Sequence, residues 1–187
     1  MPGTGSFGRL SVNDTALLLI YMQEKFVPVI HEIERVTDNC ARLVRGCREL
    51  GVPILVTEQY PRGLGRTVPQ VAEALGKFRP MEKTAFSLFD DEAVSLAILD
   101  MNRPNLLVAG VEAHVCVIRT AMDARGAGYT VHWVRDAISS RTAANAETAT
   151  RRAQQCGAFM ASTEMVLFQM IDTAEHMKFR AISKIVK

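Results

Sequence analysis

Short runs of apolar residues alternate along this chain with longer segments whose apolar positions recur at helical spacing. Most of these runs are continuously apolar, which is typical of strands covered on both faces of a sheet. One further run, shorter and of mixed polarity, is a weaker strand candidate. The runs occupy residues 16–22, 53–57, 105–111, 129–134 and 158–161, and the weaker one residues 80–85. The pattern predicts a sheet of short, mostly buried strands.

Amphipathic segments separate the apolar runs and predict helices. They cover residues 32–50, 114–125 and 142–156, and two more begin at Asp90 and after Ser162. Gly51, Gly126 and Gly157 follow three of these segments, and glycine is common just after a helix C-terminus. Because strands and helices alternate, the predicted fold is a parallel sheet between layers of helices.

The connection over residues 58–80 is longer than the others and contains several glycines and prolines. One or two helical turns are expected near residues 71–75. Its glycine-rich stretch at 63–67 lacks the lysine of a phosphate-binding loop and predicts a turn. Long ordered loops often border binding sites, so this segment is expected beside a functional site.

The composition is that of one globular domain over residues 1–187, with 48% hydrophobic and 22% charged residues. The net charge of +2 gives no reason to expect nucleic acid or a membrane as a partner. No apolar run approaches the roughly 18 residues that span a bilayer, and the N-terminus lacks a signal-peptide pattern. The four cysteines form no CxxC pair, which favours free thiols. A cytoplasmic protein is therefore expected.

The N-terminal glycines and the scattered histidines match no complete cofactor or metal motif. Gly3, Gly5 and Gly8 fit GxGxxG, but dinucleotide binding requires a strand before the motif, and here the first strand comes after it. A flexible tail over residues 1–12 is expected instead. The four histidines show no HExxH spacing. Neither a cofactor nor a metal ion is expected.

Cys116 lies in the first turn of a predicted helix, directly after a buried strand. The free N–H groups and the dipole at a helix N-terminus favour a thiolate and can hold an oxyanion. A small buried core residue is the other interpretation, and position alone leaves both open. Cys40 and Cys47 are expected in the core, and Cys156 lies at the wrong helix end for activation. Lys83, in a short and partly apolar segment, either points into a site or is a solvated charge.

Several stretches together resemble the isochorismatase-like cysteine hydrolase superfamily, in particular its isochorismatase-domain-containing subgroup, which includes proteins labelled ribonucleases. The matching stretches are MQEKF (22–26), TEQYPRGLGRTVP (57–69), EKTAFS (82–87), GVEAHVCV (110–117), DAISSR (136–141) and KFRAISK (178–184). They span nearly the whole chain, and their joint occurrence is specific although each alone is not. The resemblance implies a three-layer α/β/α fold around a mainly parallel six-stranded sheet, and a homo-oligomer.

The resemblance also implies a catalytic triad of aspartate, lysine and cysteine. Lys83 falls on the family's lysine and Cys116 on its nucleophile. A non-proline cis peptide bond is expected between Val111 and Glu112, and the N–H groups of Glu112 and Cys116 are the expected oxyanion donors. The implied reaction is hydrolysis of a small amide, imide or vinyl-ether-type substrate through a covalent Cys116 intermediate, without a cofactor.

Tyr21 is the main departure from the family pattern. The first strand of relatives ends in D-M-Q or D-x-Q, whereas Tyr21-Met22-Gln23 stands at that place here. A tyrosine, with a pKa of about 10, is neutral near pH 7 and a poor base, and its ring projects where a small substrate is expected. Losing a positioned general base costs about 10²–10⁴ in rate. Lys83 and the helix N-terminus are nevertheless expected to lower the pKa of Cys116 and leave a reactive thiolate.

Three functions stay open on the sequence alone. The first is a weakened hydrolase, whose surrogate base would be Glu24, Glu58, Glu82 or Glu112, although each is also explained as a surface or loop carboxylate. The second is a catalytically reduced relative that binds a small ligand or a protein. The third, a ribonuclease, is disfavoured by the near-neutral charge and the single tryptophan.

Overall fold

The computed structural model describes residues 7–187, and its centre is a six-stranded sheet with the strand order β3-β2-β1-β4-β5-β6. The strands are β1 (Thr15–Ile20), β2 (Ile54–Gln59), β3 (Met81–Lys83), β4 (Asn105–Gly110), β5 (Thr130–Ile138) and β6 (Phe159–Ala161). All five pairings between neighbouring strands are parallel. The predicted α/β fold with six strands is confirmed, and the sheet is parallel throughout.

β1 and β4 form the middle of the sheet, because both are continuously apolar and need cover on both faces. Every residue of these two strands is buried. They pair in register from Thr15 with Asn105 to Ile20 with Gly110. Gly110 has a φ of +113°, and a Cβ atom at this position would lie 1.9 Å from the carbonyl oxygen of Ile20. Glycine therefore allows the two strand ends to approach each other closely at the edge where the candidate site lies.

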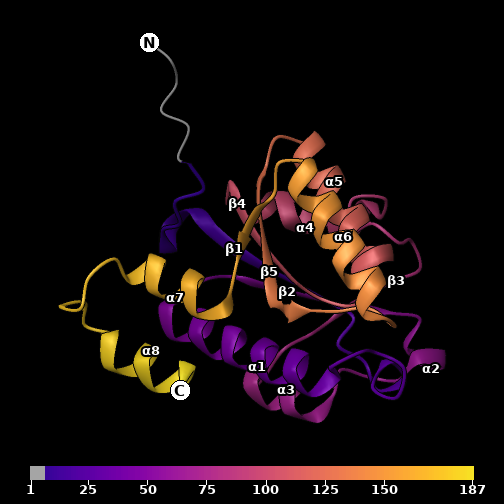
Figure 1. Ribbon diagram of the computed structural model, residues 1–187, viewed down its shortest axis with the longest axis horizontal. Coiled ribbons are helices and arrows are strands. Elements are labelled where there is room, and N and C mark those ends of the chain that lie inside the picture. The colour runs from indigo at the N-terminus through magenta and orange to yellow at the C-terminus, as the bar shows by residue number, and fades with distance from the viewer. Residues whose placement is uncertain (1–6) are drawn as a thin grey trace.

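Two layers of helices cover the sheet (Figure 1). One layer holds α1 (Ile33–Leu50), α3 (Pro69–Leu75), α7 (Thr163–Ile171) and α8 (Phe179–Val186), and the other holds α4 (Glu92–Asp100), α5 (Ile118–Gly126) and α6 (Ala143–Gln155). α1 contacts α3, α7 and α8 as well as β5. Its Cys40 and Cys47 are buried in the core, as their helical spacing predicts. All four cysteines are free thiols.

The structure differs from the predicted pattern mainly in the connections. The helix expected over residues 114–125 begins as a π-helical turn, Ala113–Val117, before α5. A one-turn helix, α2 (Pro61–Leu64), replaces part of the glycine-rich turn. α8 and the short 3₁₀ turns Val12–Asp14 and Glu24–Phe26 have no counterpart among the predicted elements, because helices this short depend on packing rather than on a long periodic pattern. No helix within residues 7–187 is both long and apolar enough to cross a bilayer.

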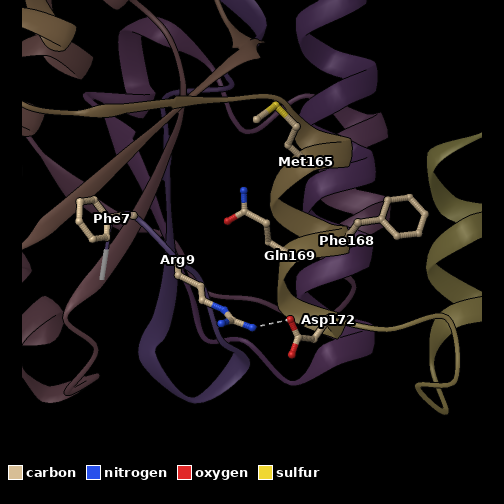
Figure 2. A pocket seen from close by; sticks show the side chains of 7 residues that line it. Phe7, Arg9, Met165, Phe168, Gln169 and Asp172 are labelled. Atoms are coloured by element: carbon tan, nitrogen blue, oxygen red, sulfur yellow. Dashed lines mark hydrogen bonds and ion pairs between the residues drawn. The ribbon is translucent and has the colours of Figure 1, made fainter. Parts of the chain in front are cut away.

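Part of the N-terminal segment packs against the fold. Leu10 is buried in the core, and Arg9 Nη2 donates a 2.8 Å hydrogen bond to Oδ1 of Asp172, just after α7 (Figure 2). Because an apolar side chain gains free energy by leaving water, the flexible tail expected over residues 1–12 does not include Leu10. Gly3 and Gly5 of the GxGxxG pattern lie outside the described residues.

Candidate active site

Four side chains converge where the carboxyl ends of β1, β2, β3 and β4 meet. Tyr21 follows β1, Gln59 ends β2, Lys83 ends β3, and Cys116 lies in the π-helical turn after β4. The order of the strands along the chain reverses between β1 and β4, and open parallel sheets bind ligands at such a switch point. The structure therefore brings Tyr21, Lys83 and Cys116 to one edge and adds Gln59 to them.

Tyr21 is completely buried at the place where the resemblance positions an aspartate. Its hydroxyl donates to the carbonyl oxygen of Ala85 over 3.2 Å and accepts a hydrogen bond from Nζ of Lys83. The backbone of Tyr21 has a φ of +50°, a left-handed conformation that costs a non-glycine residue about 1–3 kcal/mol. The chain turns sharply there, with the Gln23 N–H bonded to the Tyr21 carbonyl at 2.8 Å. β1 therefore ends at this turn, and the ring lies inside the protein.

Lys83 is buried, and its ammonium group has three oxygen acceptors. These are the Tyr21 hydroxyl and the carbonyl oxygens of Ala85 and Phe86. All three are neutral, so no ion pair offsets the loss of water around the charge. Burial accordingly lowers the pKa of Lys83 to about 8, against the opposing influence of Cys116 and of two nearby aspartates.

Cys116 is a protonated thiol at neutral pH, because burial raises its pKa to about 11. The positive charge of Lys83 and the hydrogen bond with Tyr21 oppose this rise, whereas the charge of Glu112 adds to it. The Sγ atom donates to Oε1 of Gln59 at 3.9 Å, as a thiol does. The prediction of a reactive thiolate is therefore wrong for this structure, since the exclusion of water outweighs one buried lysine and the helix end.

The peptide bond between Val111 and Glu112 is cis, at the position that the resemblance indicates. The next two backbone N–H groups bond to oxygens of residues 139–140. Within residues 7–187 the N–H of Glu112 has no hydrogen-bond acceptor, so it is free to meet a substrate oxygen. The Glu112 carboxylate itself is held by Arg141, whose Nε lies 2.7 Å from Oε2.

The other glutamates considered as surrogate bases are bound around Arg66. Glu58 is buried and accepts hydrogen bonds from the N–H and the hydroxyl of Thr67 at 2.7 and 2.8 Å. Its second oxygen lies 3.0 Å from Nη1 of Arg66, which also contacts Glu82 at 2.7 Å. Glu24 accepts from the backbone N–H of Arg66 at 3.3 Å. These carboxylates hold the long connection in place rather than face the cysteine.

Gln23 and Gln59 are site residues that the sequence reasoning did not single out. The buried Gln23 amide donates to the carbonyl oxygens of Gln59 and Gly65 at 3.1 and 2.8 Å, and accepts from the Gln59 N–H at 2.8 Å. It thereby ties the end of β1 to the end of β2, and Gln59 in turn reaches Cys116. Their position in the sequence could have indicated them, since both are polar residues at the carboxyl ends of apolar strands.

The site is closed in this structure. Tyr21 is 0% exposed, and Lys83 and Cys116 are each 4% exposed. None of the five main cavities formed by the described residues includes any of the three. No group of three or more His, Cys, Asp or Glu side chains suited to a metal ion occurs within residues 7–187.

Comparison by sequence relates this chain to isochorismatase-domain proteins. The model of the isochorismatase domain matches residues 15–165. The chain is 42% identical over 181 residues to isochorismatase domain-containing protein 2 of Danio rerio, a match that covers 96% of this chain and 90% of that protein.

Comparison by structure relates nearly the whole chain to solved proteins of the same fold. The MAR1 ribonuclease of Caenorhabditis elegans superposes with a TM-score of 0.90 at 34% identity, covering 95% of this chain and 92% of that one. The YcaC protein of Escherichia coli, described as an octameric hydrolase of unknown specificity, superposes with a TM-score of 0.84 at 22% identity, covering 94% and 95% of the two chains. At that identity the second likeness concerns the fold alone.

Proposed function

The chain belongs to the isochorismatase family, and on that premise we propose that it is a cysteine hydrolase attenuated by Tyr21. The observation that carries the proposal is the convergence of Cys116, Lys83 and Tyr21 at the carboxyl edge of the sheet, with the Lys83 ammonium bonded to the Tyr21 hydroxyl. The proximity of Cys116 and Lys83 supports the roles of nucleophile and lysine that the resemblance implies for them. A tyrosine stands where relatives carry the aspartate.

The proposed substrate is a small amide, imide or vinyl-ether-type compound. With an amide, the Cys116 thiol loses its proton and its sulfur bonds to the carbonyl carbon, while the carbonyl π electrons move to the oxygen. The free N–H of Glu112 is the donor proposed for that oxyanion, together with the N–H of Cys116. Collapse of the intermediate expels the amine with a proton. Water then cleaves the thioester, which releases the acid and restores the thiol.

Two features of the site attenuate this reaction. A thiol with a pKa of about 11 is ionised in roughly one molecule in 10⁴ at pH 7. No carboxylate occupies the position from which relatives take the thiol proton, and a missing general base costs about 10²–10⁴ in rate. Hydrolysis by this chain is therefore proposed to be slow compared with that of relatives that carry the aspartate.

A catalytically reduced binding protein is the second candidate function. The complete burial of Tyr21 and the 4% exposure of Cys116 favour it. In that case the fold presents a surface to a small ligand or a protein, and Cys116 takes no part in chemistry.

Turnover that depends on Cys116 separates the two candidates. Purified wild type and Cys116→Ser are incubated with a panel of small amides and imides at pH 8 to 9, and product is followed by chromatography. A slow release of acid by wild type that disappears in Cys116→Ser supports the hydrolase. Equal background rates in both proteins across the panel contradict it and favour the binding protein.

A homo-oligomer is also proposed, in keeping with the resemblance and with the octamer described for the E. coli relative. On α4, the apolar side chains of Leu96 and Leu99 are 53% and 62% exposed. Sedimentation velocity tests the assembly directly. A single species at the 20.6 kDa of one chain would contradict it.

RNA is not proposed as a partner, although one relative is named a ribonuclease. The chain carries a net charge of only +2, whereas RNA-binding surfaces concentrate basic and aromatic side chains. Fluorescence anisotropy with a labelled single-stranded RNA at 150 mM salt is expected to show no binding at micromolar protein.

A further inference from the structure

A proton acceptor for the Cys116 thiol is the one component of a hydrolase that this site lacks in its usual form. Each of the glutamates Glu24, Glu58, Glu82 and Glu112 is bound to an arginine or to backbone N–H groups. The groups that interact directly with the thiol are the Gln59 amide, which cannot take up a proton near neutral pH, and the Tyr21 hydroxyl. The Tyr21 hydroxyl in turn contacts Lys83.

We propose that Tyr21 and Lys83 together replace the missing aspartate, with the Lys83 amine as the base and the Tyr21 hydroxyl carrying protons between Lys83 and Cys116. This inference rests on the proposed hydrolase function and names the proton path within it. Tyr21 is then more than an obstruction: its hydroxyl connects the two retained members of the triad.

The contacts of Lys83 orient it for this role. When charged, Lys83 donates its three N–H groups to the Tyr21 hydroxyl and to the carbonyl oxygens of Ala85 and Phe86. When the amine is neutral, two N–H groups suffice for the two carbonyls. The nitrogen lone pair then faces Tyr21 and accepts the hydrogen bond from its hydroxyl. The Tyr21 oxygen then accepts the proton of Cys116 when the thiol turns that proton away from Oε1 of Gln59.

The proposed proton transfers balance in both half-reactions. The thiol proton moves to the Tyr21 oxygen as the Tyr21 proton moves to the Lys83 nitrogen, which leaves a thiolate, a neutral tyrosine and an ammonium group. After the sulfur bonds to the carbonyl carbon, the same path returns one proton to the leaving group. In the second half-reaction a water molecule gives its proton to the path and its oxygen to the thioester carbon. The thiol regains its proton as the thioester C–S bond breaks.

The charges around Lys83 permit a neutral amine near physiological pH. Burial lowers its pKa to about 8, while Cys116, Asp91 and Asp90 act in the opposite direction. About a tenth of the molecules then carry a neutral Lys83 at pH 7, and most of them do above pH 9. Tyr21 stays protonated throughout this range, because burial raises its pKa strongly. The proton path from Cys116 to Lys83 therefore becomes available as the pH rises, because Lys83 loses its proton.

The relay requires a substrate to reach the sulfur without displacing Tyr21. The ring is fully buried and held through its hydroxyl by Lys83 and Ala85. Two neighbours of the site residues, Tyr60 after β2 and Phe86 after β3, are each 58% exposed. Movement of these exposed side chains is the proposed route by which a substrate reaches Cys116.

The test uses 4-nitrophenyl acetate, whose 4-nitrophenolate release separates acylation from deacylation. Each protein in this test, including the reference called wild type, also carries Cys156→Ser, because Cys156 is the one cysteine that is not buried. Wild type is expected to show a burst that Cys116→Ser lacks, followed by deacylation that speeds up about tenfold between pH 7 and pH 9, with a midpoint near 8. Tyr21→Phe keeps the ring and is expected to slow deacylation about 100-fold at pH 8 and to lose this midpoint. Lys83→Met is expected to do the same, and the double variant to be no slower than either single one.

The outcomes distinguish the relay from the function on which it rests. If wild type shows no burst that depends on Cys116, the proposed function fails and the relay with it. If the burst is present but Tyr21→Phe deacylates within threefold of wild type with an unchanged midpoint, the relay alone is overturned. Thermal melts followed by circular dichroism check the fold of each variant. If Tyr21→Phe does not fold, the Lys83→Met protein is decisive. Loss of the midpoint near pH 8 in that variant supports the relay, and an unchanged midpoint overturns it.

Discussion

The ammonium group of Lys83 donates a hydrogen bond to the hydroxyl of Tyr21 inside a site that excludes water. A tyrosine at this place offers the lysine a neutral partner, where an aspartate would offer a charge. Lys83 is therefore a buried cation without a counter-ion, and its pKa falls to about 8. Cys116 shares the same dry environment, and its pKa rises to about 11. Burial thus places the pKa values of Lys83 and Cys116 in an order that disfavours an ion pair between them at pH 7.

Cys116 is expected to be unreactive toward alkylating agents at neutral pH. At pH 7.5 its thiolate fraction is about 10²-fold below that of a thiol with the ordinary pKa of about 8.5. Incubation with iodoacetamide, followed by peptide mass spectrometry, gives the rate at Cys116 separately from the other cysteines. We expect a rate at least tenfold below that of a small model thiol under the same conditions. A rate equal to or above the model thiol would show that Lys83 activates the cysteine after all.

Glu58→Gln is expected to reduce stability without changing the chemistry of the site. The Glu58 carboxylate accepts hydrogen bonds from the Thr67 N–H and hydroxyl and from Arg66. An amide can replace only part of this set, so the free energy of unfolding should fall by about 1–3 kcal/mol. Urea denaturation measures the loss, and the rate of Cys116-dependent hydrolysis against pH serves as the control. A changed pH profile with unchanged stability would identify Glu58 as the base instead.

His132 is expected to make the protein acid-sensitive between about pH 6.5 and pH 4. It is buried on β5 against Phe159, its Nε2 has no hydrogen-bond partner among the described residues, and burial lowers its pKa to about 4. As the pH falls through 6.5, His132 becomes protonated in the unfolded chain. In the folded chain it stays neutral until about pH 4. Stability is therefore complete above pH 6.5 and falls by about 3 kcal/mol on the way to pH 4.

His132→Phe provides the matched control for this acid sensitivity. The variant keeps an aromatic ring against Phe159 but removes the titrating group, so the slope due to this residue should disappear. Urea denaturation at pH 7, 5.5 and 4.5 measures the free energy of unfolding of both proteins. Parallel losses of stability in wild type and variant would assign the acid sensitivity to other groups.

The strands could be predicted because each buried strand is a continuous apolar run, which is a local property of the sequence. β1 and β4 are continuous apolar runs, and the structure places them within one or two residues of the predicted ends. β5 extends to Ile138, past the apolar run, because tertiary contacts support its polar end. There Asp136 accepts hydrogen bonds from the N–H and hydroxyl of Thr163, at the start of α7. No local pattern reveals that partner.

The members of the candidate site were predictable, whereas their charge states were not. The family resemblance placed Tyr21, Lys83 and Cys116, and the structure brings them to one edge. The pKa of Cys116 depends on how completely β1, the segment after β3 and the π-helical turn exclude water from it, and that is a property of the packed molecule. The sequence showed only the lysine and the helix end, which both act in the opposite direction.

The measurement that tests the central claim most directly compares wild type, Tyr21→Asp and Tyr21→Asn in Cys116-dependent hydrolysis. Both variants remove the ring, but only the aspartate restores a charged base and a counter-ion for Lys83. We predict that Tyr21→Asp hydrolyses 4-nitrophenyl acetate or a small amide about 100-fold faster than wild type, that Tyr21→Asn does not, and that Cys116→Ser abolishes the gain. A Tyr21→Asp protein that folds like wild type and is no faster would contradict the account.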